Sequence, residues 1–338
     1  MNRPTALIRI LAFSLLLVFS LTLFSCNGAG KPDKEDSALP IKVTVLNGTT
    51  GFGIARLMQN AKNGAASLNY TFDVQMDASN VMAALINGST DIAALPTNAA
   101  ATVYNRTDGA IQVLALNTLG VLYVVSNKEA VTVTDLASLR GKTVYCPASN
   151  PSVIFSALCK ASGLTVGTDV IVDTSYAEPA AVRDALTSGT IDLAVLPEPM
   201  VTIAKSKNAS LEVSLDLTEE WKKSFTESAP LVQGCIVVRK AFAEAHPNEI
   251  AKFLTEYEES IRYMTENPTD AAQMIVDMGV FAGAPAVAAA AIPNTNATFM
   301  KENEMKASLS GFLEILFSYL PSSIGGALPE NDFYYGAD

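Results

Sequence analysis

The chain has 338 residues, enough for one large domain or two medium ones. Hydrophobic residues make up 49% of the sequence, charged residues only 17%, and the formal net charge is −11. This acidic balance argues against nucleic acid as a partner. The single histidine, His246, precedes Pro247 among charged residues, which argues against a histidine-dependent catalytic site.

Residues 1–25 have the composition of a secretory signal peptide. Basic residues precede an apolar run over 10–24, which is shorter than the roughly 20 residues of a membrane-spanning helix. The run ends in Leu-Phe-Ser before Cys26, an order that resembles a bacterial lipoprotein signal, although Phe24 is bulkier than the residue usual there. We therefore expect lipidation at Cys26, a palmitate-type membrane anchor and a flexible tether over 26–39. A plain secretory signal cut elsewhere is the alternative.

The other cysteines, Cys146, Cys159 and Cys235, are odd in number and have no CxxC spacing. This pattern is typical neither of a disulfide framework nor of a metal site. We expect three thiols packed in the core, no metal and no cofactor.

A unit of 13 residues occurs twice, at 84–96 and at 185–197, with each matching pair 101 residues apart. Each copy predicts a helix that ends at a glycine, an aspartate, and a short apolar strand closed by proline. Such strands are typical of the buried middle of a parallel sheet. A repeat of this length is too long for a solenoid unit and indicates two similar α/β lobes.

The repeat extends upstream, because strands predicted at 41–46 and 142–145 are also about 100 residues apart. In both halves a loop of small polar residues follows, at 47–52 and at 147–152. Ligands of open α/β sheets bind at such loops, beyond the carboxyl ends of the strands. Two lobes that face each other in this way form a cleft.

Strands are predicted at 113–116 and 120–126, separated by a turn over 117–120, and again at 234–239. We interpret 121–125 and 234–239 as the strands by which the chain leaves the first lobe and returns to it. The predicted first lobe therefore comprises 40–125 and 236–338, and the predicted second lobe comprises 126–235.

Further helices are predicted from apolar stripes and caps. They cover residues 53–63, 135–139, 151–162 with Asn150 as the cap, 217–227, 250–264, 271–278, 284–291 and 305–320. We expect the last four to cover the first lobe and the aromatic tail around Phe333 to be packed.

Three candidate chemical motifs have competing interpretations. The glycines of 48–53 have a spacing that differs from the dinucleotide-binding fingerprint, so they form either a flexible turn or a loop whose N–H groups meet a ligand. Asp91 and Asp192 precede their strands, which favours turn or capping roles. Glu198 follows its strand between two prolines, so it either begins a surface helix or accepts hydrogen bonds from a ligand amine.

The signal, the loop 48–53, the segments D-I-A-A-L-P-T-N and D-L-A-V-L-P-E-P, and the closing G-G-A-L-P-x-x-D-F-Y-Y carry a family resemblance. They resemble substrate-binding lipoproteins of ABC importers, in the group that handles nitrate, sulfonates, taurine and the pyrimidine precursors of thiamine. The resemblance implies a type II periplasmic-binding-protein fold: two similar α/β lobes, joined by two crossover strands, that close on a small molecule. It also implies a lipid-anchored monomer outside the cytoplasm that docks on ABC permease and ATPase subunits and is not an enzyme.

The predicted ligand-binding residues follow strand ends or precede the crossover. They are Asn47, Gly48, Thr49, Thr50, Gly51, Phe52, Thr97, Asn98, Asn117, Thr118, Ser149, Asn150, Ser152 and Glu198. We expect Gly51→Leu to abolish binding and to leave folding intact.

These loops contain no lysine or arginine, and Glu198 would repel an anion. The sequence therefore favours an aminopyrimidine or another amine-bearing heterocycle, with sulfonate, taurine or nitrate as the alternative. A ligand-sensing lipoprotein, or an enzyme like the pyrimidine-synthesis relatives with histidines at its site, is the alternative of another class.

Overall fold

The computed structural model describes residues 39–338. The predicted signal peptide, Cys26 and the tether up to residue 38 therefore lie outside the described residues.

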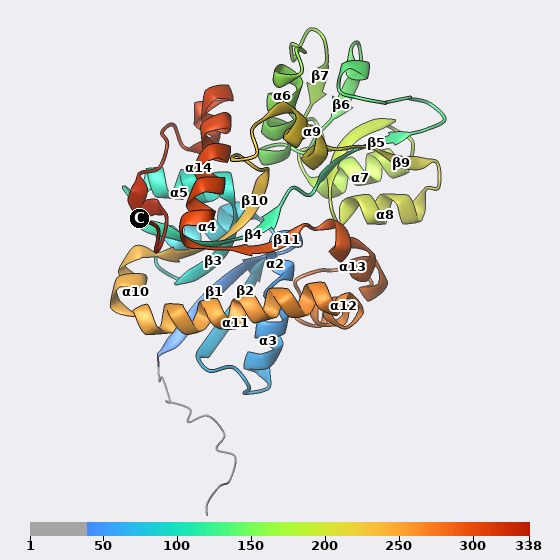
Figure 1. Cartoon of the computed structure of the whole chain (residues 1–338). Coiled ribbons are helices and arrows are strands. Elements are labelled where there is room, and N and C mark those ends of the chain that lie inside the picture. Colours follow the sequence, from blue (N-terminus) through green and yellow to red (C-terminus); the bar gives the residue numbers. More distant parts are fainter. Residues whose placement is uncertain (1–38) are drawn as a thin grey trace, which may run out of the picture. The chain divides into compact units, whose positions relative to one another are not determined.

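The first lobe is built on a six-stranded sheet (Figure 1). Its order is β11 (Ala297–Met300), β4 (Ile111–Leu119), β10 (Val232–Arg239), β3 (Ile92–Pro96), β1 (Pro40–Leu46) and β2 (Asn69–Gln75). The strands β2, β1 and β3 are parallel, whereas β10 runs antiparallel to both of its neighbours, β3 and β4.

The second lobe repeats this plan in a five-stranded sheet. Its order is β7 (Ile171–Asp173), β6 (Thr143–Tyr145), β8 (Leu193–Pro197), β5 (Leu122–Asn127) and β9 (Leu211–Asp216). As in the first sheet, three parallel strands are followed by one antiparallel strand, here β5. Strand β9 then takes the place that β4 has in the first sheet. The predicted fold of two similar α/β lobes is confirmed.

The strand that follows each crossing becomes the antiparallel strand of the sheet that it enters. The first crossing lies between Leu119 and Leu122, and the second precedes Val232. Residues 122–127 thus lie in the second sheet and 232–239 in the first, a few residues from the predicted boundaries at 125/126 and 235/236.

The predicted turn over 117–120 is wrong for its first three residues, because Asn117, Thr118 and Leu119 continue β4. Thr118 lies opposite Gly234 of β10 and Ala297 of β11, so strands on both sides hold this segment extended. Pairing with two neighbours outweighs the turn preference of the polar residues.

The helices of the first lobe are α2 (Thr49–Phe52), α3 (Ala55–Lys62), α4 (Ala78–Ile86), α5 (Thr97–Arg106), α10 (Lys240–Ala245), α11 (Pro247–Glu266), α12 (Pro268–Asp277), α13 (Pro285–Ala291) and α14 (Glu302–Tyr319). Those of the second lobe are α6 (Asn150–Ala161), α7 (Pro179–Thr187), α8 (Met200–Lys207) and α9 (Leu217–Ser224). Short 3-10 turns lie at Ala137–Leu139, Ile292–Asn294, Pro321–Ile324 and Asn331–Phe333. The predicted helices from residue 250 onward are confirmed.

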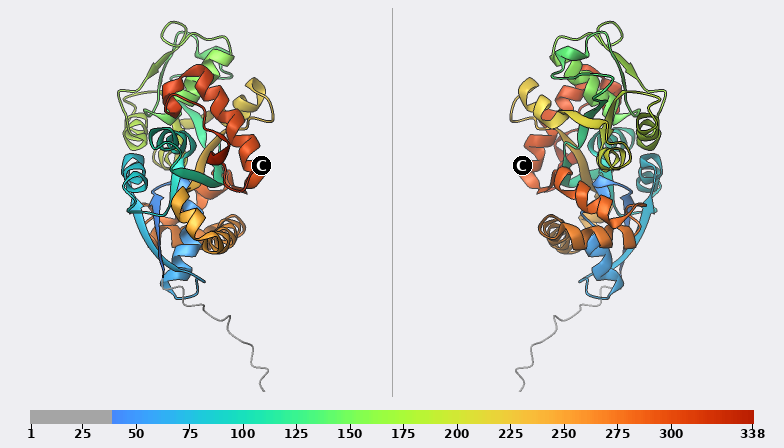
Figure 2. Two further views of the ribbon diagram at one scale, coloured as in Figure 1. Left: turned by 90° about the vertical axis from the view of Figure 1, so that its left-hand side faces the viewer. Right: turned by 90° about the vertical axis from the view of Figure 1, so that its right-hand side faces the viewer.

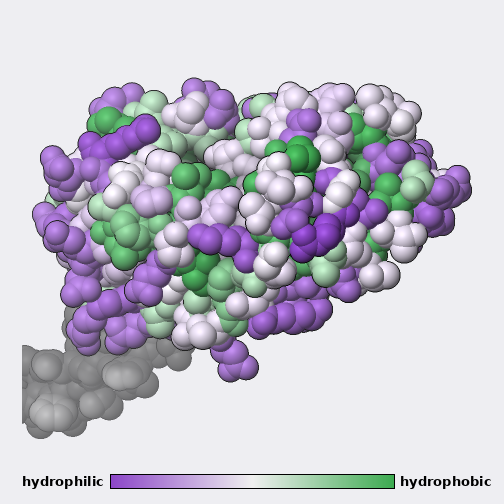
Figure 3. Space-filling view, turned by 90° about the horizontal axis from the view of Figure 1, so that it is seen from above, coloured by the Kyte–Doolittle hydropathy of each residue, from purple (hydrophilic) through white to green (hydrophobic). Residues whose placement is uncertain are grey.

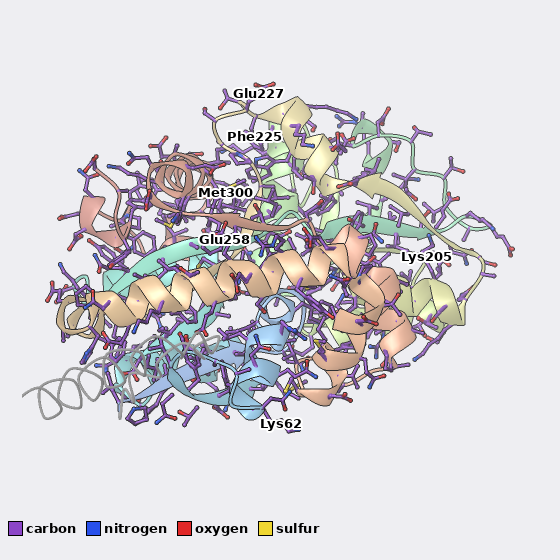
Figure 4. All side chains as sticks on the ribbon, turned by 60° about the horizontal axis from the view of Figure 1, so that its bottom comes forward. Lys62, Lys205, Phe225, Glu227, Glu258 and Met300 are labelled. Carbon is purple, nitrogen blue, oxygen red and sulfur yellow. The ribbon has the colours of Figure 1, made fainter. Side chains whose placement is uncertain are left out.

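The central strands of each sheet are buried on both faces, and alternate residues of such a strand pack against opposite layers. In β3, Ile92 and Ala94 pack with residues of α3 and α11, and Ala93 and Leu95 pack with residues of α4, α5 and α14. Figure 4 shows α11, with Glu258 labelled on it, crossing one face of the first sheet.

One hydrophobic cluster continues from the first lobe into the second. It contains Leu95 and Phe312 of the first lobe together with Phe155 and Leu193 of the second. The contact runs through α14, which packs against α6, and both side views show the C-terminal helices against the second lobe (Figure 2). Phe333 is fully buried in the same cluster, which confirms the packed aromatic tail.

The aspartate of each repeat fastens the antiparallel strand. The Asp91 carboxylate accepts from Arg239 Nη2 at 2.7 Å and from the Lys42 N–H at 3.0 Å. The Asp192 carboxylate accepts from Asn127 Nδ2 at 3.0 Å. Arg239 ends β10 and Asn127 ends β5, and each also donates its backbone N–H to the carbonyl of the same aspartate. The predicted turn or capping role of the two aspartates is therefore wrong in kind, because their carboxylates fasten neighbouring strands.

We expect Asp91→Ala to lower the free energy of unfolding by about 2 kcal/mol, because it removes a partly buried ion pair and a backbone hydrogen bond. Asp192→Ala removes the acceptor of one hydrogen bond from a neutral donor, Asn127 Nδ2, and should cost about 1 kcal/mol. Urea unfolding of the two variants measures both values. Equal losses would contradict this ranking.

Candidate ligand-binding site

A cavity of about 320 Å³ is lined by residues of both lobes. The first lobe contributes Asn47, Gly48, Thr49, Thr50, Met76, Phe281 and Ala282, and the second contributes Pro179, Ala180, Arg183, Pro197, Glu198, Pro199, Met200 and Ile203. The structure thus brings five of the predicted ligand-binding residues together, Asn47 to Thr50 and Glu198.

The segment after β1 is held by the turn before α13. Gly48 has φ of 106°, which favours glycine, and its N–H donates to the Val280 carbonyl at 3.0 Å. Asn47 Nδ2 donates to the Gly279 carbonyl at 3.2 Å. The prediction of an irregular loop over 47–52 is wrong for Thr49–Phe52, which form the single turn α2, closed by the Gly51 N–H on the Gly48 carbonyl.

Gly51 and Phe52 face the core of the first lobe. A Cβ on Gly51 would lie 2.3 Å from the Leu46 carbonyl oxygen. Phe52 is 1% exposed and packs edge-on against Phe281, with ring centroids 5.9 Å apart. The expectation that Gly51→Leu leaves folding intact is therefore wrong, because the new side chain would displace the backbone of β1.

Three other predicted residues are engaged within the first lobe. Asn117 Nδ2 donates to the Thr50 carbonyl at 3.0 Å and to Tyr257 Oη at 2.8 Å, and Asn117 Oδ1 accepts from Thr118 Oγ1 at 3.0 Å. Thr97 is fully buried and donates to the Val232 carbonyl at 2.8 Å. Asn117 thus fixes α2, whereas Thr97 fixes the start of α5 to β10.

Asn98 and Asn150 have buried oxygen atoms without a partner. Each is 7% exposed, and each lies in the first turn of a helix that follows a parallel strand, α5 in the first lobe and α6 in the second. Among the residues from 39 onward, three buried side-chain polar atoms lack a hydrogen bond, namely Asn98 Oδ1, Asn150 Oδ1 and Thr218 Oγ1. Two of the three therefore belong to predicted ligand-binding residues, but neither asparagine lines the cavity described above.

The orientation of the Asn98 amide follows from its neighbours. Its Nδ2 donates to the Ser323 carbonyl at 3.3 Å, and a flipped amide would bring two carbonyl oxygens together. The free atom of Asn98 is therefore an acceptor.

The start of α6 differs by one residue from its prediction. Ser149, and not Asn150, precedes the helix, and its φ of 68° lies in the left-handed region. Ser152 Oγ donates to the Ser149 carbonyl at 3.0 Å. Ser149 and Ser152 do not line the cavity described above.

Glu198 is 4% exposed and follows β8 directly. Its carboxylate accepts from the Thr202 N–H at 3.2 Å and from Thr202 Oγ1 at 3.0 Å, so it caps the first turn of α8. Burial raises the pKa of Glu198, and hydrogen bonds from Thr202 and Asn294 oppose that rise. A buried carboxylate of this kind is stabilised by each further donor that reaches it.

Sequence reasoning missed the apolar and cationic lining. Arg183 lines the cavity, with its side chain 16% exposed, and pairs with Asp184 at 2.8 Å. Arg183 lies in α7, one helical turn after Pro179. A search of the strand-end loops alone therefore could not find it. Met76 is 73% exposed and directly follows β2, so a large apolar residue beyond a strand end was the second signal.

Further properties of the described residues complete the description of the molecule. Within residues 39–338, no group of three or more histidine, cysteine, aspartate or glutamate residues is arranged to hold a metal, and no helix has the length and apolarity to span a membrane. Cys146, Cys159 and Cys235 are free and buried, as predicted. Seen from above, one face of the structure has hydrophilic and apolar residues interspersed (Figure 3).

Solved structures share the two-lobe fold. An ABC transporter protein from Parabacteroides distasonis aligns with a TM-score of 0.72 and 23% identity over 87% of this chain and 98% of its own. The periplasmic aliphatic sulphonate binding protein of Escherichia coli aligns with a TM-score of 0.70 and 13% identity over 87% and 90%. The ligand-binding component of an ABC-type import system from Staphylococcus aureus aligns with a TM-score of 0.65 and 14% identity over 87% and 96%. At these identities the likeness shows the fold.

No curated protein sequence is significantly similar to the chain. The model of the family described as NMT1/THI5 like matches residues 65–271, which is more than half of the 338 residues. The match runs from β2 to α12 and so includes Glu198, Arg183 and both unpartnered asparagines. This agrees with the resemblance seen in the sequence, and the chain belongs to the NMT1/THI5-like family.

Proposed function

We propose that the protein is the extracytoplasmic solute-binding component of an ABC importer. It captures a small molecule between its lobes by hinge closure and delivers it to a permease with its ATPase. The cavity lined by both lobes supports this proposal, because a ligand there would contact both halves at once. The importer proteins among the similar structures support it as well.

The ligand that we propose carries N–H donors, as an aminopyrimidine or another amine-bearing heterocycle does. The observation that carries this choice is the buried Glu198 carboxylate, which lines the cavity and accepts hydrogen bonds. Asn98 Oδ1 and Asn150 Oδ1 lie outside the lining of the cavity and would add acceptors where the lobes close on the ligand. A buried acceptor left unsatisfied costs about 1–3 kcal/mol, which a donor on the ligand would recover. Nitrate has no donor to offer them.

A sulfonate is the second candidate. Arg183 lines the cavity and is the cation that an anionic head group would meet there. The similar structures named for aliphatic sulphonate and nitrate binding support this alternative. Taurine, which carries an amine and a sulfonate, would use Arg183 and Glu198 together.

We further propose that the chain acts as a monomer anchored by lipid at Cys26, at the outer face of the cytoplasmic membrane or in the periplasm. We expect a clickable palmitate analogue fed to producing cells to label the protein, and Cys26→Ser to abolish the label. Cys235→Ser is the control, because that thiol is fully buried. Label retained in Cys26→Ser would contradict the anchor.

A binding panel tests the ligand class. We expect 4-amino-5-hydroxymethyl-2-methylpyrimidine, at a concentration near 100 times its dissociation constant, to raise the melting temperature of the full chain by several degrees. Nitrate and an alkanesulfonate should not. A shift with the alkanesulfonate alone would favour the second candidate.

The matched pair Asn98→Ala and Asn105→Ala tests the donor contact. Both side chains lie on α5 and donate to the turn Pro321–Ile324, Asn98 to Ser323 and Asn105 to Ile324 at 2.8 Å. We expect only Asn98→Ala to weaken aminopyrimidine binding, by roughly tenfold for one lost hydrogen bond of about 1.4 kcal/mol. Equal affinities in titration calorimetry would exclude Asn98 from the site.

A closing substitution tests the position of the site. Ala180 lines the cavity at the start of α7 and is exposed, so Ala180→Trp should fill the cavity without disturbing the core. We expect it to abolish binding in the same titration and to leave the melting temperature unchanged. Ala130→Trp, on an exposed turn of the second lobe, is the control. Normal affinity in Ala180→Trp would place the ligand elsewhere.

A further inference from the structure

The turn after α13 joins the first lobe to the second outside the ligand cavity. It comprises residues 294–296, from the last residue of the 3-10 turn Ile292–Asn294 to the residue before β11. Its Thr295 is 1% exposed, and both its N–H and its Oγ1 donate to the Ile292 carbonyl, so the turn is tied to the first lobe.

Asn296 binds the crossing itself. Its Nδ2 donates to the Gly120 carbonyl at 2.6 Å, and its carbonyl accepts from the Leu119 N–H at 3.0 Å. Asn296 has φ of 44°, a left-handed conformation that asparagine tolerates. Because these contacts lie where the chain passes between the lobes, a hinge motion changes them little.

Asn294 reaches beyond the crossing to the sheet of the second lobe. Its carbonyl accepts from Tyr123 Oη at 3.0 Å, and its Nδ2 donates to Glu198 Oε1 at 3.5 Å, a long bond. Tyr123 lies in β5 and is 8% exposed, so both partners on the second lobe are buried. Helix α13 also contacts α8, the helix on which Figure 4 labels Lys205.

Neither Asn294 nor Tyr123 lines the cavity that we assign to the ligand. Both instead line a separate hollow with Lys205 and Val213, on the other side of Glu198. The hydrogen bond between Tyr123 and Asn294 therefore connects the two lobes directly, without a ligand between them.

We propose that the arrangement of the lobes in this structure, in which Tyr123 and Asn294 are bonded, is the closed one, and that the two residues form a latch that stabilises it before any ligand is bound. The proposal rests on the hinge closure of the proposed function. Bonds that break when the lobes open shift the equilibrium toward the closed state, and a larger closed fraction lowers the apparent dissociation constant. Tyr123 and Asn294 are in this sense positioning residues for ligand capture.

The test is the distance between the lobes in the ligand-free full chain. Spin labels are placed at Lys62→Cys on α3, labelled in Figure 4, and at Glu212→Cys on β9, both exposed positions. Cys26→Ser removes the thiol outside the described residues, and Cys146, Cys159 and Cys235 are buried and resist labelling. Double electron–electron resonance then measures the distribution of distances.

Tyr123→Phe deletes one hydroxyl and keeps the ring, so it should fold as the parent does. We expect it to raise the ratio of open to closed lobes by roughly fivefold, and Tyr123→Phe with Asn294→Ala to raise it by about tenfold or more. The matched control is Asn80→Ala, whose side chain bonds Gln75 at 3.2 Å within the first lobe and should change nothing.

An unchanged distribution in both latch variants would overturn the latch. The distribution is measured without ligand, so this result does not depend on the ligand class. Titration with the aminopyrimidine on the same samples reports separately on the proposed function. Longer distances in the latch variants, with or without aminopyrimidine binding, support the latch.

Discussion

The strand that follows each crossing is held at its far end by an aspartate of the sheet that it enters. In both lobes this strand runs antiparallel to the parallel strand beside it. Asp91 provides that anchor for β10 through Arg239, and Asp192 provides it for β5 through Asn127. Asp91 directly precedes β3, which pairs with β10, and Asp192 directly precedes β8, which pairs with β5. Each aspartate therefore helps to fix the register between the two strands of its pair. The two lobes can then repeat one sheet plan although their antiparallel strands come from opposite crossings.

The predicted ligand-binding residues of the first lobe differ in how far the fold satisfies their polar atoms. Asn117 Nδ2 donates to Thr50 and to Tyr257, and its Oδ1 accepts from Thr118, so the side chain keeps α2 in place. Asn98 Nδ2 donates to Ser323, whereas its Oδ1 is buried and has no partner. Buried polar atoms in native proteins are almost always paired. An unpaired acceptor at the start of α5, beyond a parallel strand, is therefore the feature that a bound donor would complete.

Contacts between the lobes differ in kind. Helix α14 packs against α6 in a continuous apolar core, a contact without direction that tolerates small shifts. Asn294 meets Tyr123 and Glu198 through hydrogen bonds, which hold only over a narrow range of distances. The hydrogen-bonded contact is therefore the more sensitive of the two to a change in the distance between the lobes.

The sequence by itself determined the repeat, the α/β class, the two crossings and the helical C-terminal region, because periodic apolar positions and local turn residues encode them. It also indicated the strand-end loops of the cavity, including Glu198. Which of those polar residues hydrogen-bond within the protein became clear only from the tertiary structure. Asn117 appeared to belong to a turn because its two neighbouring strands are distant in sequence, and Arg183 was missed because only packing brings α7 to the cavity. Partners far apart along the chain leave no local pattern, so pairing, burial and the direction of a side chain are settled only when the lobes come together.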